Sequence, residues 1–452
     1  MTLSSNREAA GGSSIAAGVP DRLRSFGRAP RIVGLDIARG LAVLGMAAAH
    51  TVALPGEIRW SDPATWAELV SGRSSILFAV LAGVSIALMT GRSRIPTGAD
   101  LATQRLRLVA RGLVIFAIGL VLELLGTNIA VILTFYGAVY AVAIMFVGMR
   151  AHALVVWAAA IAVAGPALSA ALIALSPSAS GSGISFILEG TYSIVPWTAL
   201  MLAGLALGRL DVTRKKIAVF ALIAGAVLSA FGYTAGSVWG AGNSSSMSWA
   251  SWSSSSSSFD DEFVVEAVPG DQIDLVGKVC EDYGDGYVSC YPEEQAFTGA
   301  YEESVVDEDG NGWSSYGESI AAADVPGTML TAFFSSGPHT GGTMEILGSG
   351  GLAIAIIALL VLTGESLRYV LLPLAAVGSM PLTAYSAHVV AIWVVVGPGG
   401  WNQPALLYPF LAVGLLIACS AWAILAGRGP LERLTAGAAA RLAPSAKRAP
   451  AA

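Results

Sequence analysis

Charged residues are scarce in this chain. Asp, Glu, Lys and Arg make up 12% of its 452 residues, hydrophobic residues make up 55%, and the mean hydropathy is +0.68. A soluble domain of this length would need a more highly charged surface. The composition therefore excludes an ordinary soluble protein and indicates a polytopic membrane protein built from α-helices.

Basic residues are almost absent from residues 240–345. This segment holds nineteen Asp and Glu residues but only one Lys or Arg residue, Lys278, and it opens with a serine tract typical of a flexible linker. The net charge of −6 therefore reflects mainly one segment, while the basic residues lie elsewhere. We interpret residues 240–345 as an acidic insert in a helical membrane protein.

Long hydrophobic runs account for most of the remaining chain. Each is about 17 to 25 residues long, the length that crosses a bilayer as a helix. They lie near residues 33–54, 68–90, 109–126, 129–148, 153–175, 193–209, 217–239, 346–363, 372–397 and 404–427. We therefore expect about ten transmembrane helices. Pro373, Gly378 and Pro381 would break the ninth run, which makes an eleventh element an alternative.

The basic clusters indicate how these helices are oriented. If the N-terminus is cytoplasmic, the clusters near Arg31, Arg92, Arg150 and Arg214 all fall inside, as the positive-inside rule requires. The acidic insert then lies outside a plasma membrane. The expected regions are a disordered cytoplasmic tail (1–30), transmembrane helices 1–7 (31–239), the extracytoplasmic insert (240–345), transmembrane helices 8–10 (346–427) and a basic cytoplasmic tail (428–452).

The insert has two features that suggest a small folded module. Valines and aromatic residues alternate loosely over residues 263–291, as in short strands, and Cys280 and Cys290 could form a disulfide in an oxidising compartment. Residues 307–318 also fit the calcium-loop pattern D-x-[DN]-x-[DN]-G-x5-E. The calcium ligands would be Asp307, Asp309, Asn311 and Glu318. A solvated acidic loop is the alternative, because Ser314 occupies a position that is usually aliphatic.

Several ionisable residues gather at the predicted outer level of the membrane. His50 ends the first run, Arg73 lies a few residues into the second, and Glu123 lies near the outer end of the third. Intramembrane ionisable groups are costly and usually pair or take part in chemistry. An outward-opening cavity lined by these groups would explain their presence, although an Arg73–Glu123 ion pair is an alternative for those two residues.

Four further residues are candidates for substrate binding. Tyr192 and Trp197 start the sixth run from the outside, while Tyr385 and His388 share nearly one face of the ninth. An interfacial aromatic belt is the alternative for the first two, and a polar contact between helices is the alternative for His388. Asp36 and Arg39, at i and i+3, are most simply a structural ion pair.

Five segments resemble the heparan-alpha-glucosaminide N-acetyltransferase family and its bacterial relatives. They are the first run and residues 71–88, 190–210, 378–393 and 429–434. The residues that carry the resemblance are Asp36, Arg39, Gly40, Phe78, Gly83, Ser85, Tyr192, Pro196, Trp197, Gly204, Gly208 and Arg209. In animal members the catalytic His lies in the first outer loop. That loop has no His here, and His50 lies just before it, where bacterial relatives often carry one.

The resemblance implies an acyltransferase. Such an enzyme takes an acyl group, typically acetyl, from cytosolic acetyl-CoA and delivers it to a hydroxyl or amine of a sugar or glycan outside. His50 would act as general base or transient acyl carrier, Glu123 would orient its imidazole, and Arg73 would hold the oxyanion or an anionic part of a substrate. Both a covalent acyl-His intermediate and direct attack by the acceptor remain open. We expect no nucleic-acid partner.

Two other classes of function are alternatives. A transporter could use the intramembrane His, Glu and Arg residues as a proton or substrate relay. Common transporter designs contain internal repeats with helix breaks in matching positions, and the two halves of this chain show no such similarity. A surface protein that is merely anchored in the membrane would not need ten spans.

Overall fold

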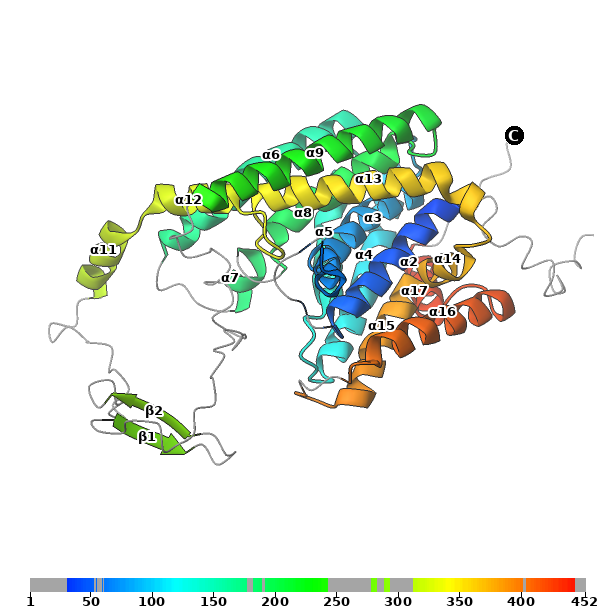
Figure 1. Cartoon of the computed structure of the whole chain (residues 1–452). Helices are drawn as coiled ribbons and strands as arrows, with labels where there is room; N and C mark the ends of the chain where they lie inside the picture. The colour runs from blue at the N-terminus through cyan, green and yellow to red at the C-terminus, as the bar shows by residue number, and fades with distance from the viewer. Residues whose placement is uncertain are drawn as a thin grey trace, which may run out of the picture.

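The computed structural model is a bundle of α-helices with a β-hairpin outside it (Figure 1). The structure describes residues 31–52, 54, 59, 61–176, 182–188, 192–242, 278–282, 288–292, 312–400 and 404–443. The first half of the bundle contains α2 (Val33–Ala49), the 3-10 helix η1 (Pro63–Val70), α3 (Arg73–Met89), α4 (Gly98–Glu123), α5 (Ile132–Phe146), α6 (Ala151–Ala174), α7 (Ser182–Ile187), α8 (Ile194–Arg209) and α9 (Lys215–Gly242). The second half contains α11 (Gly312–Ala322), α12 (Val325–Phe334), α13 (Thr343–Leu367), α14 (Leu372–Ser379), α15 (Pro381–Val396), α16 (Leu407–Leu425) and α17 (Pro430–Leu442).

Each of the ten apolar runs contains a helix or, in one case, a bent pair of helices. Only five helical segments in the described part of the chain are long and apolar enough to cross a membrane, or six if the bent pair is one span. The expected ten or eleven transmembrane helices are therefore not confirmed. Helices α2, α5 and α8 have 17, 15 and 16 residues, and α4 carries Arg105, Arg107 and Arg111 near its middle.

The predicted break in the ninth run is present. Helices α14 and α15 meet at Met380 with a bend of 91°. Pro381 is the first residue of α15, where its missing N–H costs no helical hydrogen bond. The break redirects the chain, and the buried face of α15 carries Tyr385 and His388.

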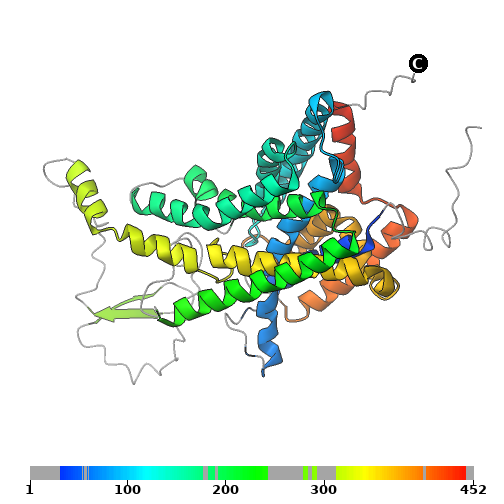
Figure 2. The same cartoon turned by 90° about the horizontal axis from the view of Figure 1, so that it is seen from above.

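Small residues let the central helices approach closely. Gly83 on α3 and Gly204 on α8 face each other's helices, and a Cβ at either position would collide with the backbone of the neighbouring helix, at Met201 or Val80. Close contact of this kind stabilises helix pairs inside a bilayer, where the hydrophobic effect does not drive helices together. On one side of this core, α9 and α13 run alongside each other (Figure 2).

The insert contains one β-hairpin in its described part, formed by β1 (Lys278–Asp282) and β2 (Val288–Pro292). The larger β-rich module expected from residues 263–291 is not confirmed, since the other residues of that range lie outside the described part of the chain. In the antiparallel register, Cys280 and Cys290 are directly opposite partners. Their disulfide stays a prediction, and this register is compatible with it.

The two ends of the bundle are held together by different contacts. We call the end that contains Arg92, Arg150 and Arg214 the inner end, and the end that contains His50, Asn128 and Gly399 the outer end. At the inner end, the guanidinium of Arg209, the last residue of α8, donates to three backbone oxygens. Those of Thr90 and Arg92 lie between α3 and α4, and that of Val147 lies between α5 and α6. At the outer end, the N–H of Gly399 donates to the carbonyl of Gly126 at 2.7 Å. The alternating helix directions agree with the predicted topology, whose placement in a membrane stays a prediction.

Candidate active site

Two histidines from opposite halves of the chain meet inside the bundle. His50 caps the C-terminus of α2, and its Nδ1 lies 3.2 Å from Nε2 of His388 on α15. Their rings are stacked, with centroids 5.4 Å apart and planes 18° apart. His388 is 0% exposed and packs edge-on against the Tyr385 ring, one turn earlier on the same helix. The hydroxyl of Tyr385 accepts a hydrogen bond from the backbone N–H of Ile132, which fixes this ring.

A cavity of about 760 Å³ opens at the outer end beside His50. Its walls come from the end of α2, the turn between α4 and α5, and the loop between α15 and α16. The lining residues are Ala49, His50, Thr51, Val52, Leu54, Thr127, Asn128, Ile129, Ile392, Val396, Gly397, Gly400 and Ala405. The buried hydroxyl of Thr127 has no hydrogen-bond partner in the part of the chain that is described. We call this space the outer cavity.

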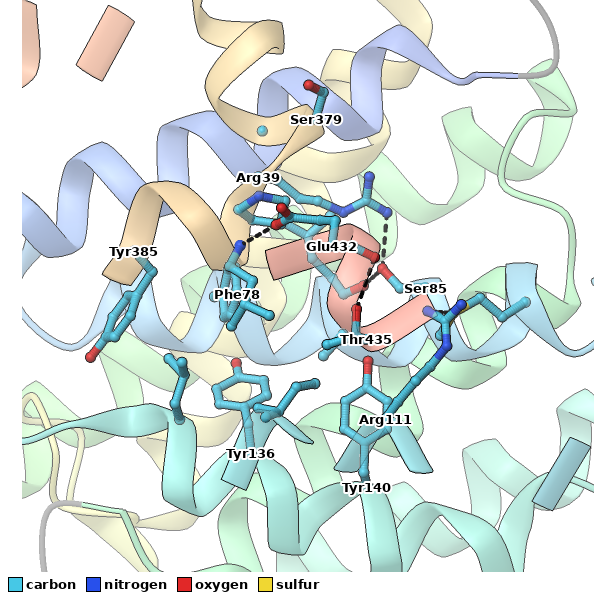
Figure 3. Close-up of a pocket in the computed structure, with 18 residues that line it drawn as sticks. Arg39, Phe78, Ser85, Arg111, Tyr136, Tyr140, Ser379, Tyr385, Glu432 and Thr435 are labelled. Atoms are coloured by element: carbon cyan, nitrogen blue, oxygen red, sulfur yellow. Dashed lines mark hydrogen bonds between the residues drawn. The ribbon is translucent and has the colours of Figure 1, made fainter. Parts of the chain in front are cut away.

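A second cavity, of about 220 Å³, lies toward the inner end (Figure 3). Helices α2, α3, α4, α5, α15 and α17 surround it, and we call it the inner cavity. Its polar or aromatic lining residues are Arg39, Phe78, Ser85, Arg111, Tyr136, Tyr140, Ser379, Tyr385, Glu432 and Thr435. The Tyr136 hydroxyl points into this space (Figure 3) and has no hydrogen-bond partner among the described residues. A buried polar atom without a partner at a cavity wall indicates a place for a polar group of a ligand.

The imidazole pair separates the two cavities. Tyr385 lines the inner cavity, His50 lines the outer cavity, and His388 contacts both of these residues. A group bound in the inner cavity therefore meets the Tyr385 side of this wall, while a group bound in the outer cavity meets His50. The arrangement suits a reaction between two molecules that enter from opposite ends.

Asp36 and Arg39 form an ion pair at 2.7 Å, and Arg31 adds a longer contact of 3.6 Å to the same carboxylate. The other terminal nitrogen of Arg39 donates to Ser85 Oγ at 2.9 Å. Arg39 therefore has a structural role in joining α2 to α3 and also presents a cation to the inner cavity.

Arg73 and Glu123 do not pair with each other. Arg73 donates to the carbonyl of Glu68 and to the Tyr233 hydroxyl, both at 2.8 Å. Glu123 accepts a hydrogen bond from the Thr134 hydroxyl at 2.7 Å. The contact that orients the His50 ring comes from His388, a role that the sequence had suggested for Glu123. The sequence missed this because the two histidines are separated by 338 residues.

Tyr192 and Trp197 belong to an aromatic cluster near the outer end. Their ring centroids are 5.3 Å apart, and both contact Phe135. Tyr192 also contacts the ring of His339. Sequence reasoning found no role for His339. It is held by the buried carboxylate of Glu345, which accepts hydrogen bonds from the His339 and Gly341 backbone N–H groups.

Glu432 on α17 is a second residue that sequence reasoning left without a role. Its carboxylate accepts hydrogen bonds from the backbone N–H groups of Leu382 and Thr383 and from the Thr383 hydroxyl, at 2.8, 3.1 and 2.5 Å. It thus caps α15 from another helix, because the first N–H groups of a helix lack partners within it. The only sequence signal was its place in GPLERL, after the last apolar run.

The calcium interpretation has no support from the described residues. Asp307, Asp309 and Asn311 lie outside them, and α11 already begins at Gly312, where a calcium loop would make its sharp turn. Glu318 lies on this helix, and no group of three or more His, Cys, Asp or Glu residues that could hold a metal ion occurs within the described ranges.

The comparison with known families agrees with this geometry. Residues 31–236 match the family model described as heparan-alpha-glucosaminide N-acetyltransferase, catalytic. Over this range the chain is similar to the catalytic domain of that family. No curated protein and no solved structure matches the chain. The match includes His50, Arg39 and Tyr136 and ends before the acidic insert, so the resemblance of residues 378–393 and 429–434 stays a prediction.

The match over residues 31–236 implies a transferase of the acetyltransferase type. The apolar helices are those of a multi-pass membrane protein. The matched range supplies one wall of each cavity, through α2 to α5, while Tyr385, His388 and Glu432 come from the chain beyond it. The candidate active site therefore needs both halves of the protein.

Proposed function

We propose that this protein is a membrane acyltransferase that takes an acyl group, preferably acetyl, from cytosolic acyl-CoA and delivers it to a hydroxyl or amine of an extracytoplasmic sugar or glycan. The observation that carries the proposal is the His50–His388 pair between an inner and an outer cavity. The similarity of residues 31–236 to the family supports the acetyl group and the sugar acceptor. The predicted topology supports a plasma-membrane enzyme with its inner cavity toward the cytosol.

The inner cavity is the proposed donor site. Arg39 and Arg111 both line it. Arg39 is paired with Asp36, so Arg111 is the cation that we assign to a phosphate of acyl-CoA. Deeper in the cavity, the hydroxyl of Tyr136 is the donor that we assign to the thioester carbonyl. A hydrogen bond there would strengthen as the carbonyl oxygen becomes an oxyanion. This assigns to Tyr136 the oxyanion role that the sequence had suggested for Arg73.

The outer cavity is the proposed acceptor site. Its volume of about 760 Å³ lies in the range of small-molecule pockets. The hydroxyl of Thr127 and the ring of His50 are polar groups on walls that are otherwise largely apolar, which is a suitable arrangement for orienting one hydroxyl of a sugar ring. Tyr192, Trp197, Arg73 and Glu123 line neither cavity, so any contact of theirs with substrate would need a different conformation.

The transfer requires a base that removes a proton from the attacking hydroxyl or amine and a group that finally takes this proton up. Direct transfer requires the wall formed by Tyr385 and His388 to open, so that the acceptor in the outer cavity reaches the thioester in the inner cavity. Nε2 of His50 then takes the proton of the acceptor O–H or N–H as that atom attacks the thioester carbon. The new C–O or C–N bond forms, the C–S bond breaks, and the proton passes to the CoA thiolate. In the covalent route, His50 nitrogen first displaces CoA and then releases the acyl group to the acceptor. Contact with His388 allows the second ring to share the positive charge that develops on His50 in either route.

The test uses the full-length protein in detergent with acetyl-CoA labelled in the acetyl group. Wild type, His50→Ala and the control His152→Ala are compared for CoA release and for label retained on the protein, with and without mixed cell-envelope glycans. His152 is exposed at the start of α6, so its variant controls for the loss of an imidazole. We expect release to fall at least 100-fold in His50→Ala and to remain unchanged in His152→Ala.

Retained label in the wild type would support the acyl-His route, and release only in the presence of glycans would support direct transfer. Absence of CoA release from acetyl-CoA and from longer acyl-CoAs would contradict the proposal. It would favour the alternative of a transporter that uses the buried histidines as a proton relay.

A further inference from the structure

An apolar groove lies far from the imidazole pair, on the opposite side of α8. It has a volume of about 320 Å³, and every lining residue is apolar or glycine. Helices α6 and α9 form its banks, while α8 and α13 form its floor. Ala159 on α6 and Ala224 on α9 are examples of the small side chains that leave it open.

A void of this kind needs an occupant inside a membrane. Unfilled apolar walls lose dispersion contacts, and the groove edge reaches the surface of the bundle at Val155 and Phe220, which are 49% and 68% exposed. The groove follows α9 from Ile217 to Leu228, about 17 Å along the helix axis. This length corresponds to about one leaflet of a hydrocarbon core roughly 30 Å thick.

The inner end of the groove carries positive charge. Leu210 and Ile217 line it, and the turn between them holds Arg214, followed by Lys215 and Lys216 at the start of α9. Arg214 pairs with Asp211 at 3.4 Å, and a hydrogen bond from Thr213 lowers the pKa of the Asp211 carboxyl, which stabilises its ionised form. Arg214 is thereby compensated, whereas Lys215 and Lys216 present exposed cations next to the groove.

We propose that the groove binds one acyl chain of an anionic glycerophospholipid from the inner leaflet, with the headgroup phosphate on Lys215 and Lys216. Charge selects the lipid class, because a zwitterionic headgroup gains less from two adjacent lysines than an anionic one. The groove and the lysines can therefore bind the same lipid molecule. The lysines would bind its headgroup at the inner end, and its acyl chain would extend from there along the groove. The site is independent of acyl transfer.

The test measures lipid retention on the detergent-purified full chain by native mass spectrometry. The probes are phosphatidylglycerol and phosphatidylcholine with identical chains. We expect one tightly bound phosphatidylglycerol in the wild type and weaker binding of phosphatidylcholine. The double variant Lys215→Gln/Lys216→Gln should weaken phosphatidylglycerol binding by about tenfold or more. The control Arg428→Gln/Arg441→Gln removes the same charge at exposed positions on elements that do not line the groove and should leave the affinity within about twofold.

A second pair of variants tests the groove itself. Ala159→Phe/Ala224→Phe fills it from both banks and should remove the tight site for phosphatidylglycerol, whereas Ala421→Phe on the exposed face of α16 should not. Equal retention of the two lipids, equal weakening by the Arg428→Gln/Arg441→Gln control, or wild-type binding by the filled variant would each overturn the proposal. If the filled variant fails to fold, the lysine double variant and its control still test whether the site binds an anionic lipid.

Discussion

Nε2 of His388 lies 3.2 Å from Nδ1 of His50, with the two rings stacked and the outer cavity on the His50 side. Either ring nitrogen can be the donor, so a proton can be shared between the rings. The second ring also excludes water from the inner side of His50, because His388 is 0% exposed. The relationship gives His388 a positioning role that differs from the substrate contact predicted from the sequence.

The first prediction concerns this pair. His388→Ala should lower kcat for acetyl transfer by about 10² to 10³, because His50 loses both its orientation and the partner that shares its charge. His50→Ala/His388→Ala should be about as slow as His50→Ala alone, since residues that act as a unit show non-additive losses. Steady-state CoA release from the three variants is the measurement. Losses that multiply in the double variant would show that His388 acts independently of His50.

Tyr136→Phe is the second prediction. It removes only a hydroxyl that has no partner within the described chain, so the fold should be kept and the melting temperature should not fall. We expect kcat to fall by about 10² and KM for acetyl-CoA to change little, because an oxyanion donor acts mainly in the transition state. Tyr369→Phe is the control, since Tyr369 is 72% exposed. A higher KM with unchanged kcat would instead assign Tyr136 to ground-state binding.

The third prediction concerns the cap that α17 places on α15. Glu432→Ala removes the acceptor for two backbone N–H groups and for the Thr383 hydroxyl, so it should destabilise the protein by about 1 to 2 kcal/mol. Glu432→Gln keeps an acceptor oxygen and should lose less. Thermal unfolding in detergent compares both with Glu365→Ala, an exposed glutamate on α13. If Glu365→Ala lowers the melting temperature equally, the cap does not contribute to stability.

Arg209 is the subject of the fourth prediction. It is 4% exposed, and its terminal nitrogens donate to the Thr90, Arg92 and Val147 carbonyls and to the Thr90 hydroxyl. Arg209→Lys leaves several of these acceptors unpaired, because an ammonium lacks the planar fork, and should cost about 2 kcal/mol or more. The readouts are melting temperature and the yield of monodisperse protein. Arg150→Lys, at an exposed position before α6, should have no effect.

The sequence predicted the local parts of this molecule well. Each apolar run contains a helix, and the break before α15 follows from Pro381, because proline and its neighbour restrict the backbone locally. The Asp36–Arg39 pair also follows from its i, i+3 spacing. The number of spans is not confirmed, because hydropathy averaged over a run does not show that α5 ends after 15 residues.

The site was predictable residue by residue but not as an arrangement. His50 and His388 were both candidates, since an imidazole in an apolar run is rare enough to be noticed. Their contact depends on how α2 packs beside α15, which no local pattern encodes. An Arg73–Glu123 pair was suggested only because both residues were predicted to lie at one level of the membrane. In the structure, Arg73 instead contacts Tyr233, and Glu123 contacts Thr134. Tyr136 was missed because a tyrosine in an apolar helix has no distinctive pattern, and only the unpartnered hydroxyl marks it.

The final prediction concerns Cys280 and Cys290, which are directly opposite partners in the β1–β2 hairpin. Opposite residues in an antiparallel pair have Cα atoms about 4.5 to 5.5 Å apart, within the usual span of a disulfide. If the insert lies outside the membrane as the charge pattern predicts, these cysteines should be oxidised. Alkylation of the denatured protein with a mass-tagged maleimide should then label one of the three cysteines before reduction, namely Cys419, and all three after it. Cys280→Ser should expose a second reactive thiol without reductant.

Three labelled cysteines in the unreduced wild type would contradict the disulfide and remove one support for the extracytoplasmic insert. One labelled cysteine would place the hairpin, and with it the outer cavity, on the oxidising side.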